Sequence, residues 1–224
     1  MHIAKSGIFR HLLSYVKQIP IESVKGEFNE SLEVLLLEGK YMLNSPHATY
    51  SYEDRYTSYK TALWVIRPEL KNIRSVLVLG LGLGSIPQML QKIHEVSCII
   101  DCVEYDNTVI QLAEKYYPPD CNFKNLQIHH ADALDWMNKN SKKFDLITVD
   151  LFMDKNVPEK FHTENFILNL RSTLSETGVL LFSRLKENYK SEKKLQDNLQ
   201  KVFIGGEDID TGGNLIYCYK STIA

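Results

Sequence analysis

Short apolar runs that alternate with helix-like segments dominate the chain from residue 75 onward. The runs typical of strands buried on both faces are residues 75–79, 98–104, 126–130, 144–150 and 179–184. Apolar positions at helical spacing occupy the segments between them, residues 84–94, 106–117, 132–140 and 163–174. Strands that alternate with helices in this way predict right-handed βαβ units and a mostly parallel sheet.

The two ends of the chain follow a different pattern. Residues 8–19 predict a short helix that Pro20 ends, and residues 32–37 and 40–44 predict a β-hairpin in a small antiparallel unit over residues 20–50. A helix is expected over residues 56–66. We therefore expect a small N-terminal unit over residues 1–68 and an α/β domain of Rossmann type over residues 69–224.

The C-terminal part is expected to end the sheet with a strand that runs antiparallel to the others. The pattern predicts a helix over residues 189–201, a weak strand at 202–204 and a final strand at 214–219. Two strands joined by so short a segment are antiparallel. An antiparallel C-terminal strand is thus expected at the end of an otherwise parallel sheet.

Charge and cysteine content narrow the possible partners. The 224 residues carry a net charge of −2, and no apolar run approaches the roughly 20 residues that span a bilayer, so neither nucleic acid nor a membrane is expected. The four cysteines are scattered, and His129-His130 has no third ligand at metal spacing, so no metal site is expected. Free thiols and the lack of a signal-peptide pattern favour a cytoplasmic location.

Three alternate glycines, Gly80, Gly82 and Gly84, separate the first buried run from the helix that follows it. Glycines permit a sharp turn and a close ligand approach, and the helix N-terminus favours anionic or polar ligand groups. A P-loop lacks support because no Gly-Lys-Ser/Thr follows. A dinucleotide fingerprint stays open with Ser85 at its sixth position. The third interpretation is the nucleoside loop of S-adenosylmethionine-dependent enzymes.

Acidic residues end the next predicted strands. Glu104 lies at roughly the 20-residue offset expected of a ribose-binding acid, and its two oxygens suit a vicinal diol. Asp132, with the neighbouring Ala133, follows the third strand and is expected near the adenine. Asp150 ends the fourth strand. The carboxyl ends of parallel strands share one edge, so these groups predict one ligand site.

From about residue 31 to 184 the chain resembles the spermidine synthases, aminopropyltransferases with a class I S-adenosylmethionine methyltransferase fold. The similar segments are EGK at 38–40, YEDRYTSY at 52–59, VLGLGLG at 78–84, VEYD at 103–106, VD at 149–150 and FHTENF at 161–166. The resemblance implies a nucleoside site, a small N-terminal β-unit and a homodimer. It also implies that Asp150 is a catalytic base and that Tyr59 assists it on the acceptor side.

Several positions depart from the pattern of that family. Leu81 and Leu83 replace a glycine and an aspartate of its glycine loop. Met153 takes the place of a second acid, whose role Asp154 is expected to fill on the acceptor side beside Tyr56. Arg55 and Lys60 add positive charge where the family has acidic or polar residues. Because a diamine is dicationic and needs several carboxylates, these changes favour a neutral or anionic small-molecule acceptor.

The sequence thus leads to three hypotheses. The main one is an S-adenosylmethionine-dependent methyltransferase, which Leu83 favours because its loop position would no longer repel the carboxylate of the cofactor. The alternative is an aminopropyltransferase that uses decarboxylated S-adenosylmethionine. The second alternative is a non-catalytic nucleoside-binding module.

Overall fold

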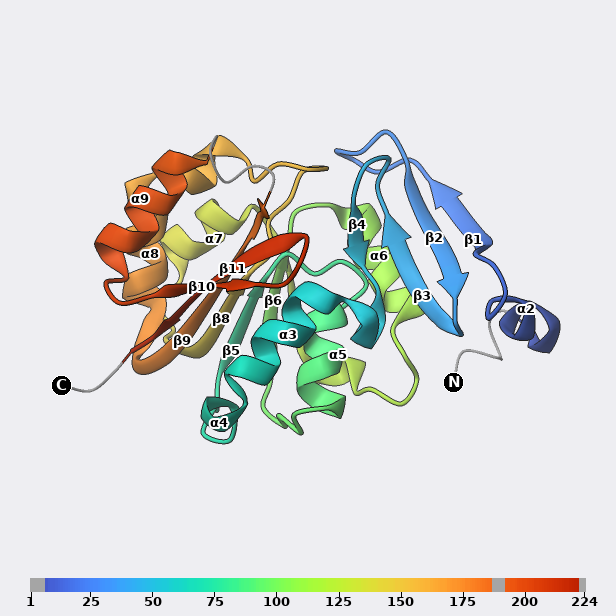
Figure 1. Cartoon of the computed structure of the whole chain (residues 1–224), viewed down its shortest axis with the longest axis horizontal. Coiled ribbons are helices and arrows are strands. Elements are labelled where there is room, and N and C mark those ends of the chain that lie inside the picture. The colour runs from blue at the N-terminus through green and yellow to red at the C-terminus, as the bar shows by residue number, and fades with distance from the viewer. Residues whose placement is uncertain (1–6, 187–191, 222–224) are drawn as a thin grey trace.

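Two β-sheets stand side by side in the computed structural model, which describes residues 7–186 and 192–221 (Figure 1). The larger sheet occupies the middle of the molecule, and the smaller one, drawn in blue, lies at its N-terminal side. This arrangement confirms an α/β fold with a small antiparallel N-terminal β-unit.

The larger sheet has seven strands in the order β10-β11-β9-β8-β5-β6-β7. Its strands are β5 (Val76–Leu79), β6 (Ile100–Glu104), β7 (Leu126–His130), β8 (Phe144–Val149), β9 (Leu174–Leu185), β10 (Glu207–Asp210) and β11 (Asn214–Lys220). Strands β5 to β9 pair in parallel, whereas β11 pairs with β9 and with β10 in antiparallel fashion. All four residues of β5 are buried, which explains its unbroken apolar sequence.

Helices cover both faces of this sheet. On one face lie α3 (Thr57–Val65), α4 (Arg67–Leu70) and α5 (Ser85–Lys92), and on the other lie α7 (Ala133–Lys139), α8 (Glu164–Thr173) and α9 (Lys193–Val202). Leu195 and Leu199 of α9 are fully buried, and each contributes roughly 2 kcal/mol through the area that it removes from water. No helix in residues 7–186 and 192–221 is long and apolar enough to span a bilayer.

The smaller sheet has the order β1-β2-β3-β4 and is antiparallel throughout. Its strands are β1 (Ile19–Val24), β2 (Leu32–Leu37), β3 (Lys40–Asn44) and β4 (Thr49–Ser51), preceded by α2 (Ile8–Leu13). Its apolar face packs on α6 (Asn107–Tyr116), which follows β6 of the larger sheet. Helix α6 therefore joins the two sheets through one shared apolar cluster.

Three 3₁₀ turns complete the secondary structure of the described residues: η1 (Glu53–Arg55), η2 (Phe123–Asn125) and η3 (Glu159–His162). The strand predicted at 202–204 is wrong, because Phe203 ends a helix and is fully buried. The observed strand is β10, whose mostly exposed acidic residues gave no apolar signal. The predicted helix start at 189 lies outside the described residues, and the division at residues 68 and 69 stays a prediction.

The turn between β5 and α5 depends on glycine at two closely packed positions. Gly84 has φ +83°, and a Cβ added there would lie 2.5 Å from Cε2 of Tyr117. Gly80 has φ +91°, and a Cβ added there would lie 2.4 Å from the carbonyl oxygen of Asp150. Both positions combine a left-handed backbone with a lack of space, so a side chain is excluded for two reasons.

We expect Gly84→Ala to lower the free energy of unfolding by about 2–4 kcal/mol, because it adds steric overlap to left-handed strain. Gly205→Ala is the matched control, since Gly205 has φ +88° but nothing within 4 Å of an added Cβ. The control is expected to lose only about 1 kcal/mol. Urea denaturation of the two variants measures the difference, and equal losses would contradict the close packing at Gly84.

Candidate active site

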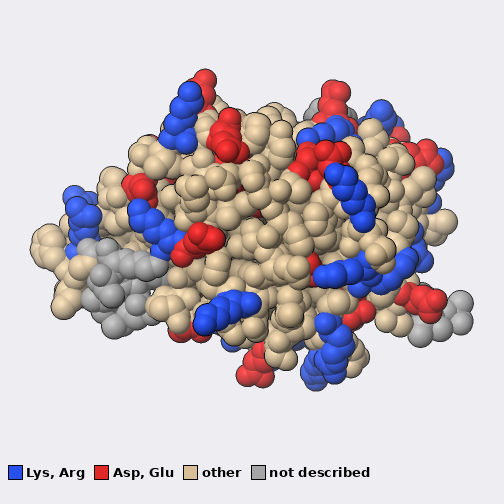
Figure 2. Space-filling model, turned by 180° about the vertical axis from the view of Figure 1, so that it is seen from behind, with Lys and Arg blue, Asp and Glu red and all other residues tan. Residues whose placement is uncertain are grey.

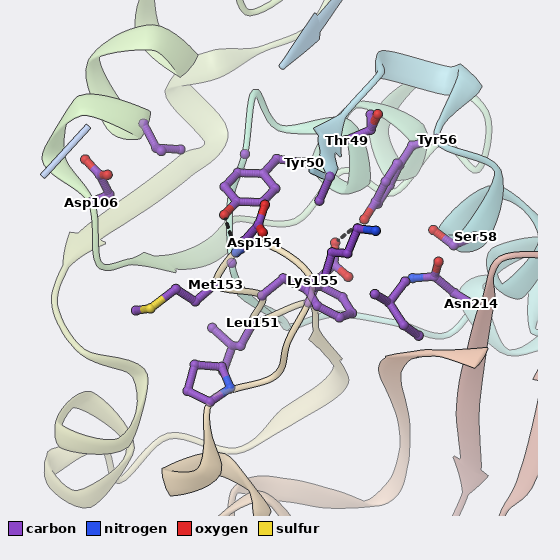
Figure 3. A pocket seen from close by; sticks show the side chains of 18 of the residues that line it. Thr49, Tyr50, Tyr56, Ser58, Asp106, Leu151, Met153, Asp154, Lys155 and Asn214 are labelled. Carbon is purple, nitrogen blue, oxygen red and sulfur yellow. Dashed lines mark hydrogen bonds between the residues drawn. The ribbon is translucent and has the colours of Figure 1, made fainter. Parts of the chain in front are cut away.

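A cavity of about 840 Å³ opens at the carboxyl edge of strands β5 to β8. Its walls come from the ends of these strands, from loops of the N-terminal unit and from the turn between β10 and β11. Figure 3 shows part of this lining, with Asp106 on one side, Tyr56, Ser58 and Asn214 on the other, and Asp154 and Lys155 between them. The cavity thus has two ends with different side chains.

Strand register places three of the predicted site residues at one level. Leu79 of β5 pairs with Val103 of β6 and with Val149 of β8. The next residue on each strand is Gly80, Glu104 or Asp150, and all three line the cavity. The missing side chain of Gly80 lets the Asp150 backbone approach, which brings the glycine turn and the two acids into one site.

The Glu104 carboxylate is held by the backbone at the floor of the cavity. Its Oε2 accepts a hydrogen bond from the Leu81 N–H at 2.9 Å, and its Oε1 accepts from the N–H groups of Tyr105 at 2.8 Å and Asp106 at 3.0 Å. Burial raises the pKa of Glu104, and these backbone N–H groups oppose the shift. The carboxylate is fixed in direction and keeps acceptor capacity on Oε2, as a ribose diol requires.

Asp132 and Ala133 lie beside it at the start of α7. Asp132 is the N-cap, and its Oδ1 accepts from the N–H of Leu134 at 2.9 Å. Its Oδ2 pairs with Nζ of Lys160, which belongs to η3. Ala133 is buried, and both residues line the cavity. A polar capped turn next to a small apolar side chain suits the edge and face of a purine.

Aromatic side chains cover this end of the cavity. The rings of Phe28 and Tyr105 stack with centroids 4.0 Å apart, and Nζ of Lys160 lies 5.2 Å from the centroid of Tyr105. Phe28 comes from the loop between β1 and β2, which the Asp106 carboxylate holds through the Glu27 N–H at 3.2 Å. The N-terminal unit therefore supplies one wall of the nucleoside end.

Asp150 forms a pair with Tyr56 at the other end. The Tyr56 hydroxyl donates to Oδ2 of Asp150 at 2.8 Å. Oδ1 is buried and has no hydrogen-bond partner within the part of the chain that the structure describes. Burial raises the pKa of Asp150 to about 6, although the hydroxyls of Tyr56 and Ser183 act to lower it. A carboxylate with this pKa can accept a proton near neutral pH.

Tyr59 does not lie on the acceptor side as expected. It is fully buried, it is absent from the cavity lining, and its hydroxyl donates to the Val149 carbonyl at 2.8 Å. The tyrosine that reaches Asp150 is Tyr56, three residues earlier, at the start of α3. The two rings stack with centroids 6.2 Å apart, but only Tyr56, the N-cap residue of α3, lines the cavity.

Asp154 lines the cavity, but the N-terminal unit holds its carboxylate. Its Oδ1 accepts from the Ser45 hydroxyl at 2.9 Å and from the His47 N–H at 3.1 Å. Its own N–H donates to the Tyr50 hydroxyl at 2.7 Å, and that hydroxyl donates to Asn29 at 2.9 Å. Asp154 therefore ties the loop after β8 to the smaller sheet.

Leu83 does not lie near the ligand site as expected. Leu83 is 1% exposed and packs in the apolar cluster shared by the smaller sheet and α6. Leu81 is likewise buried, and neither side chain lines the cavity. Gly82 does line it, whereas Gly84 instead packs against Tyr117. Alternate residues of the turn point into the protein, so Leu83 says nothing about a cofactor carboxylate.

Several residues that line the cavity were not predicted from the sequence, because they come from elements far from the glycine turn along the chain. Phe28 and Asn29 come from the loop between β1 and β2, Tyr50 comes from β4, and Asn214 comes from β11. Of these residues, only Tyr50 belongs to a pattern that is visible in the sequence, because it is one of four tyrosines in a ten-residue stretch. Within residues 7–186 and 192–221, no group of three or more His, Cys, Asp or Glu side chains could hold a metal ion.

Comparisons with known proteins link the chain to one family. The model of the spermine/spermidine synthase domain matches residues 59–205. The polyamine aminopropyltransferase of Vibrio vulnificus is 32% identical over 126 residues, which cover 55% of this chain and 40% of that protein. The chain spans about half the length of the curated relatives it matches.

Solved structures agree on the fold. Spermidine synthase from Thermotoga maritima superposes with a TM-score of 0.69 at 20% identity, covering 90% of this chain and 72% of that one. Human methyltransferase-like protein 13, solved in complex with SAH, gives a TM-score of 0.62 at 22% identity, covering 73% of this chain and 81% of that one. At these identities the likeness concerns the fold alone.

The raised pKa of Asp150 predicts a distinctive pH dependence of stability. An unfolded aspartate has a pKa near 3.9, so the folded protein binds the proton more tightly, and stability falls as the pH rises from about 4 through about 6. Asp150→Asn removes this loss and should be more stable than the wild type at pH 7.5, by at most about 3 kcal/mol. The difference should shrink below pH 4 in urea titrations at several pH values.

Asp145→Asn is the control of opposite sign. Burial acts to raise the pKa of Asp145, but hydrogen bonds from Arg74, Ser175 and Ser75 outweigh it and lower the pKa. Its charge stabilises the fold at neutral pH, so this variant should lose stability at pH 7.5. An Asp150→Asn protein less stable than the wild type at pH 7.5 would contradict a raised pKa at Asp150.

Proposed function

The chain belongs to the spermine/spermidine synthase domain family, and we propose that it transfers an aminopropyl group from decarboxylated S-adenosylmethionine to a small amine acceptor. The observation that carries this proposal is the Asp150–Tyr56 pair, which lies in the same cavity as the Glu104 carboxylate. The relatives named above favour this alternative over the methyltransferase hypothesis of the sequence.

The residues of the site fit such a donor. Glu104 would hold the ribose hydroxyls, and Asp132 with Ala133 would face the adenine. Five carboxylates line the cavity: Glu104, Asp106, Asp132, Asp150 and Asp154. The same lining carries four cationic side chains, Arg55, Lys155, Lys160 and Lys186, so five negative charges face four positive ones. The remaining negative charge favours a donor that carries a sulfonium and an ammonium over one with the added carboxylate of S-adenosylmethionine.

The transfer needs a nucleophilic amine and a proton acceptor. When bound, the donor supplies an aminopropyl carbon attached to a sulfonium; the amine lone pair forms the new C–N bond while the C–S electrons pass to sulfur. Asp150, which lines the cavity, takes the proton that the amine nitrogen loses. Tyr56 holds the carboxylate in place through Oδ2. Most of the remaining rate enhancement comes from holding the two reactants in line.

The N-terminal unit is proposed to close the site over its ligands. Tyr50 connects the loop that carries Asn29 with the loop that carries Asp154, and these loops border the cavity. Excluding water would strengthen the electrostatic contacts of Asp150 and Glu104. A cytoplasmic location and a homodimer stay predictions from the sequence.

Glu104→Gln tests the donor site by isothermal titration calorimetry. The wild type should bind decarboxylated S-adenosylmethionine more tightly than S-adenosylmethionine, and the variant should lose about 100-fold in affinity as charged hydrogen bonds to two hydroxyls are removed. Glu22→Gln is the control, because Glu22 bonds Lys115 and Tyr116 and does not line the cavity. Tighter binding of S-adenosylmethionine would return the methyltransferase hypothesis to first place.

Tyr56→Phe tests the base by steady-state kinetics. The acid limb of the kcat/KM profile should lie near pH 6 in the wild type, since activity needs the ionised Asp150. The hydrogen bond from Tyr56 lowers the pKa of Asp150, so its loss should move the limb to higher pH and reduce kcat/KM by about tenfold.

Tyr59→Phe is the matched control for this experiment. Its hydroxyl bonds a backbone carbonyl, so its loss should cost about 1 kcal/mol of stability and leave the acid limb in place. A shift of the limb in the Tyr59 variant alone would contradict the assignment of Tyr56.

A further inference from the structure

We infer that the acceptor is a monoamine whose far end is neutral or anionic, and not a diamine; this inference rests on the proposed aminopropyl transfer. The charges around the acceptor end of the cavity carry it. A bound ammonium loses its water shell and needs a carboxylate or several hydrogen-bond acceptors in return. A dicationic acceptor therefore needs at least two such places beyond those that serve the donor.

Few carboxylates are left for the acceptor. Glu104, Asp106 and Asp132 belong to the nucleoside end, where each is fixed by backbone N–H groups. Oδ1 of Asp154 already accepts from Ser45 and His47. The proposed donor itself carries two positive charges, so it also needs carboxylates of the cavity. Asp154 keeps its negative charge, because its two hydrogen-bond donors are neutral, and it would serve the ammonium of the donor. Asp150 is then the carboxylate that remains for one acceptor nitrogen.

Cationic side chains line the same part of the cavity. They are Arg55, Lys155 and Lys186. Arg55 pairs with Glu38 and Lys186 pairs with Asp210, and both of these acids lie outside the cavity lining. Figure 3 shows Lys155 between Asp154 and the side that carries Tyr56 and Asn214. Lys60, which the sequence also suggested, does not line the cavity.

The remaining polar groups at this end are neutral. Ser58, Asn214 and Thr211 line it, and Asn214 donates to the Ser183 hydroxyl at 2.9 Å. Hydroxyl and amide groups can bond an alcohol or a carboxylate, but without a negative charge they compensate a second ammonium poorly. The wall thus accepts one protonated amine at Asp150 and a neutral or anionic group beyond it.

Part of this wall comes from outside the matched family domain. The family model covers residues 59–205, whereas Arg55, Tyr56, Ser58, Thr211 and Asn214 lie before or after it. The nucleoside residues from Gly80 to Ala133 and the base Asp150 all lie within it. The acceptor end is therefore built partly by segments that the family model does not match.

Three four-carbon amines that differ only at the far end test the inference by calorimetry in the presence of 5′-methylthioadenosine. They are 1,4-diaminobutane, 4-aminobutanol and 4-aminobutyrate. We expect the alcohol or the acid to bind at least tenfold more tightly than the diamine. Diamine binding that equals or exceeds both, or no detectable binding of any of the three, overturns the inference.

Lys155→Glu should reverse the preference. It adds a carboxylate at the acceptor end and should raise the affinity for 1,4-diaminobutane about tenfold relative to the wild type. Lys124→Glu changes the net charge equally outside the cavity lining and should leave the ranking of the amines unchanged. An unchanged ranking in both variants would count against the inference.

Different results would exclude the proposed function and the monoamine inference. If decarboxylated S-adenosylmethionine does not bind the wild type, aminopropyl transfer is excluded whatever the amine ranking. If the donor binds and the diamine is the best acceptor for release of 5′-methylthioadenosine, the function stands and the monoamine inference is wrong.

Discussion

The close approach of Gly80 to the backbone of Asp150 is the constraint on which the site depends. A Cβ on Gly80 would lie 2.4 Å from the Asp150 carbonyl oxygen, so only glycine lets these strand ends meet. The Gly80 N–H donates to Val103 at 2.9 Å and the Asp150 N–H donates to Leu79 at 2.8 Å, which fixes three strand ends at one level. The carboxyl groups of Glu104 and Asp150 therefore line one cavity.

The smaller sheet turns this edge into an enclosed site. The loop between β1 and β2 carries Phe28 and Asn29, and the hydroxyl of Tyr50 in β4 joins this loop to the loop that carries Asp154. The apolar cluster that holds the smaller sheet on α6 includes Leu83 from the glycine turn itself. The turn therefore has two faces, one toward the cavity and one toward the contact between the sheets. Figure 2 shows the molecule from behind the view of Figure 1, and on that face Lys, Arg, Asp and Glu side chains are interspersed.

The two ends of the cavity differ in electrostatics for a physical reason. At the nucleoside end the acids accept backbone N–H groups at strand ends and helix N-caps, so their positions follow from the fold. At the acceptor end burial raises the pKa of Asp150 to about 6, although the hydroxyls of Tyr56 and Ser183 act to lower it. The cations near it sit on loops and on a strand end, where substitution leaves the sheet intact. Ligand specificity can therefore change at this end while donor binding is kept.

The sequence by itself determined the alternation of strands and helices, the glycine turn and the acids at the strand ends. Those features rest on local periodicity and on the rule that carboxyl ends of parallel strands share an edge. It missed β10, because an exposed edge strand such as Glu207–Asp210 carries no apolar signal. Only the tertiary structure decided that Tyr56 rather than Tyr59 meets Asp150 and that Leu83 belongs to the core. Which side of a helix or turn faces the cavity depends on packing between distant segments, and a linear pattern does not contain that packing.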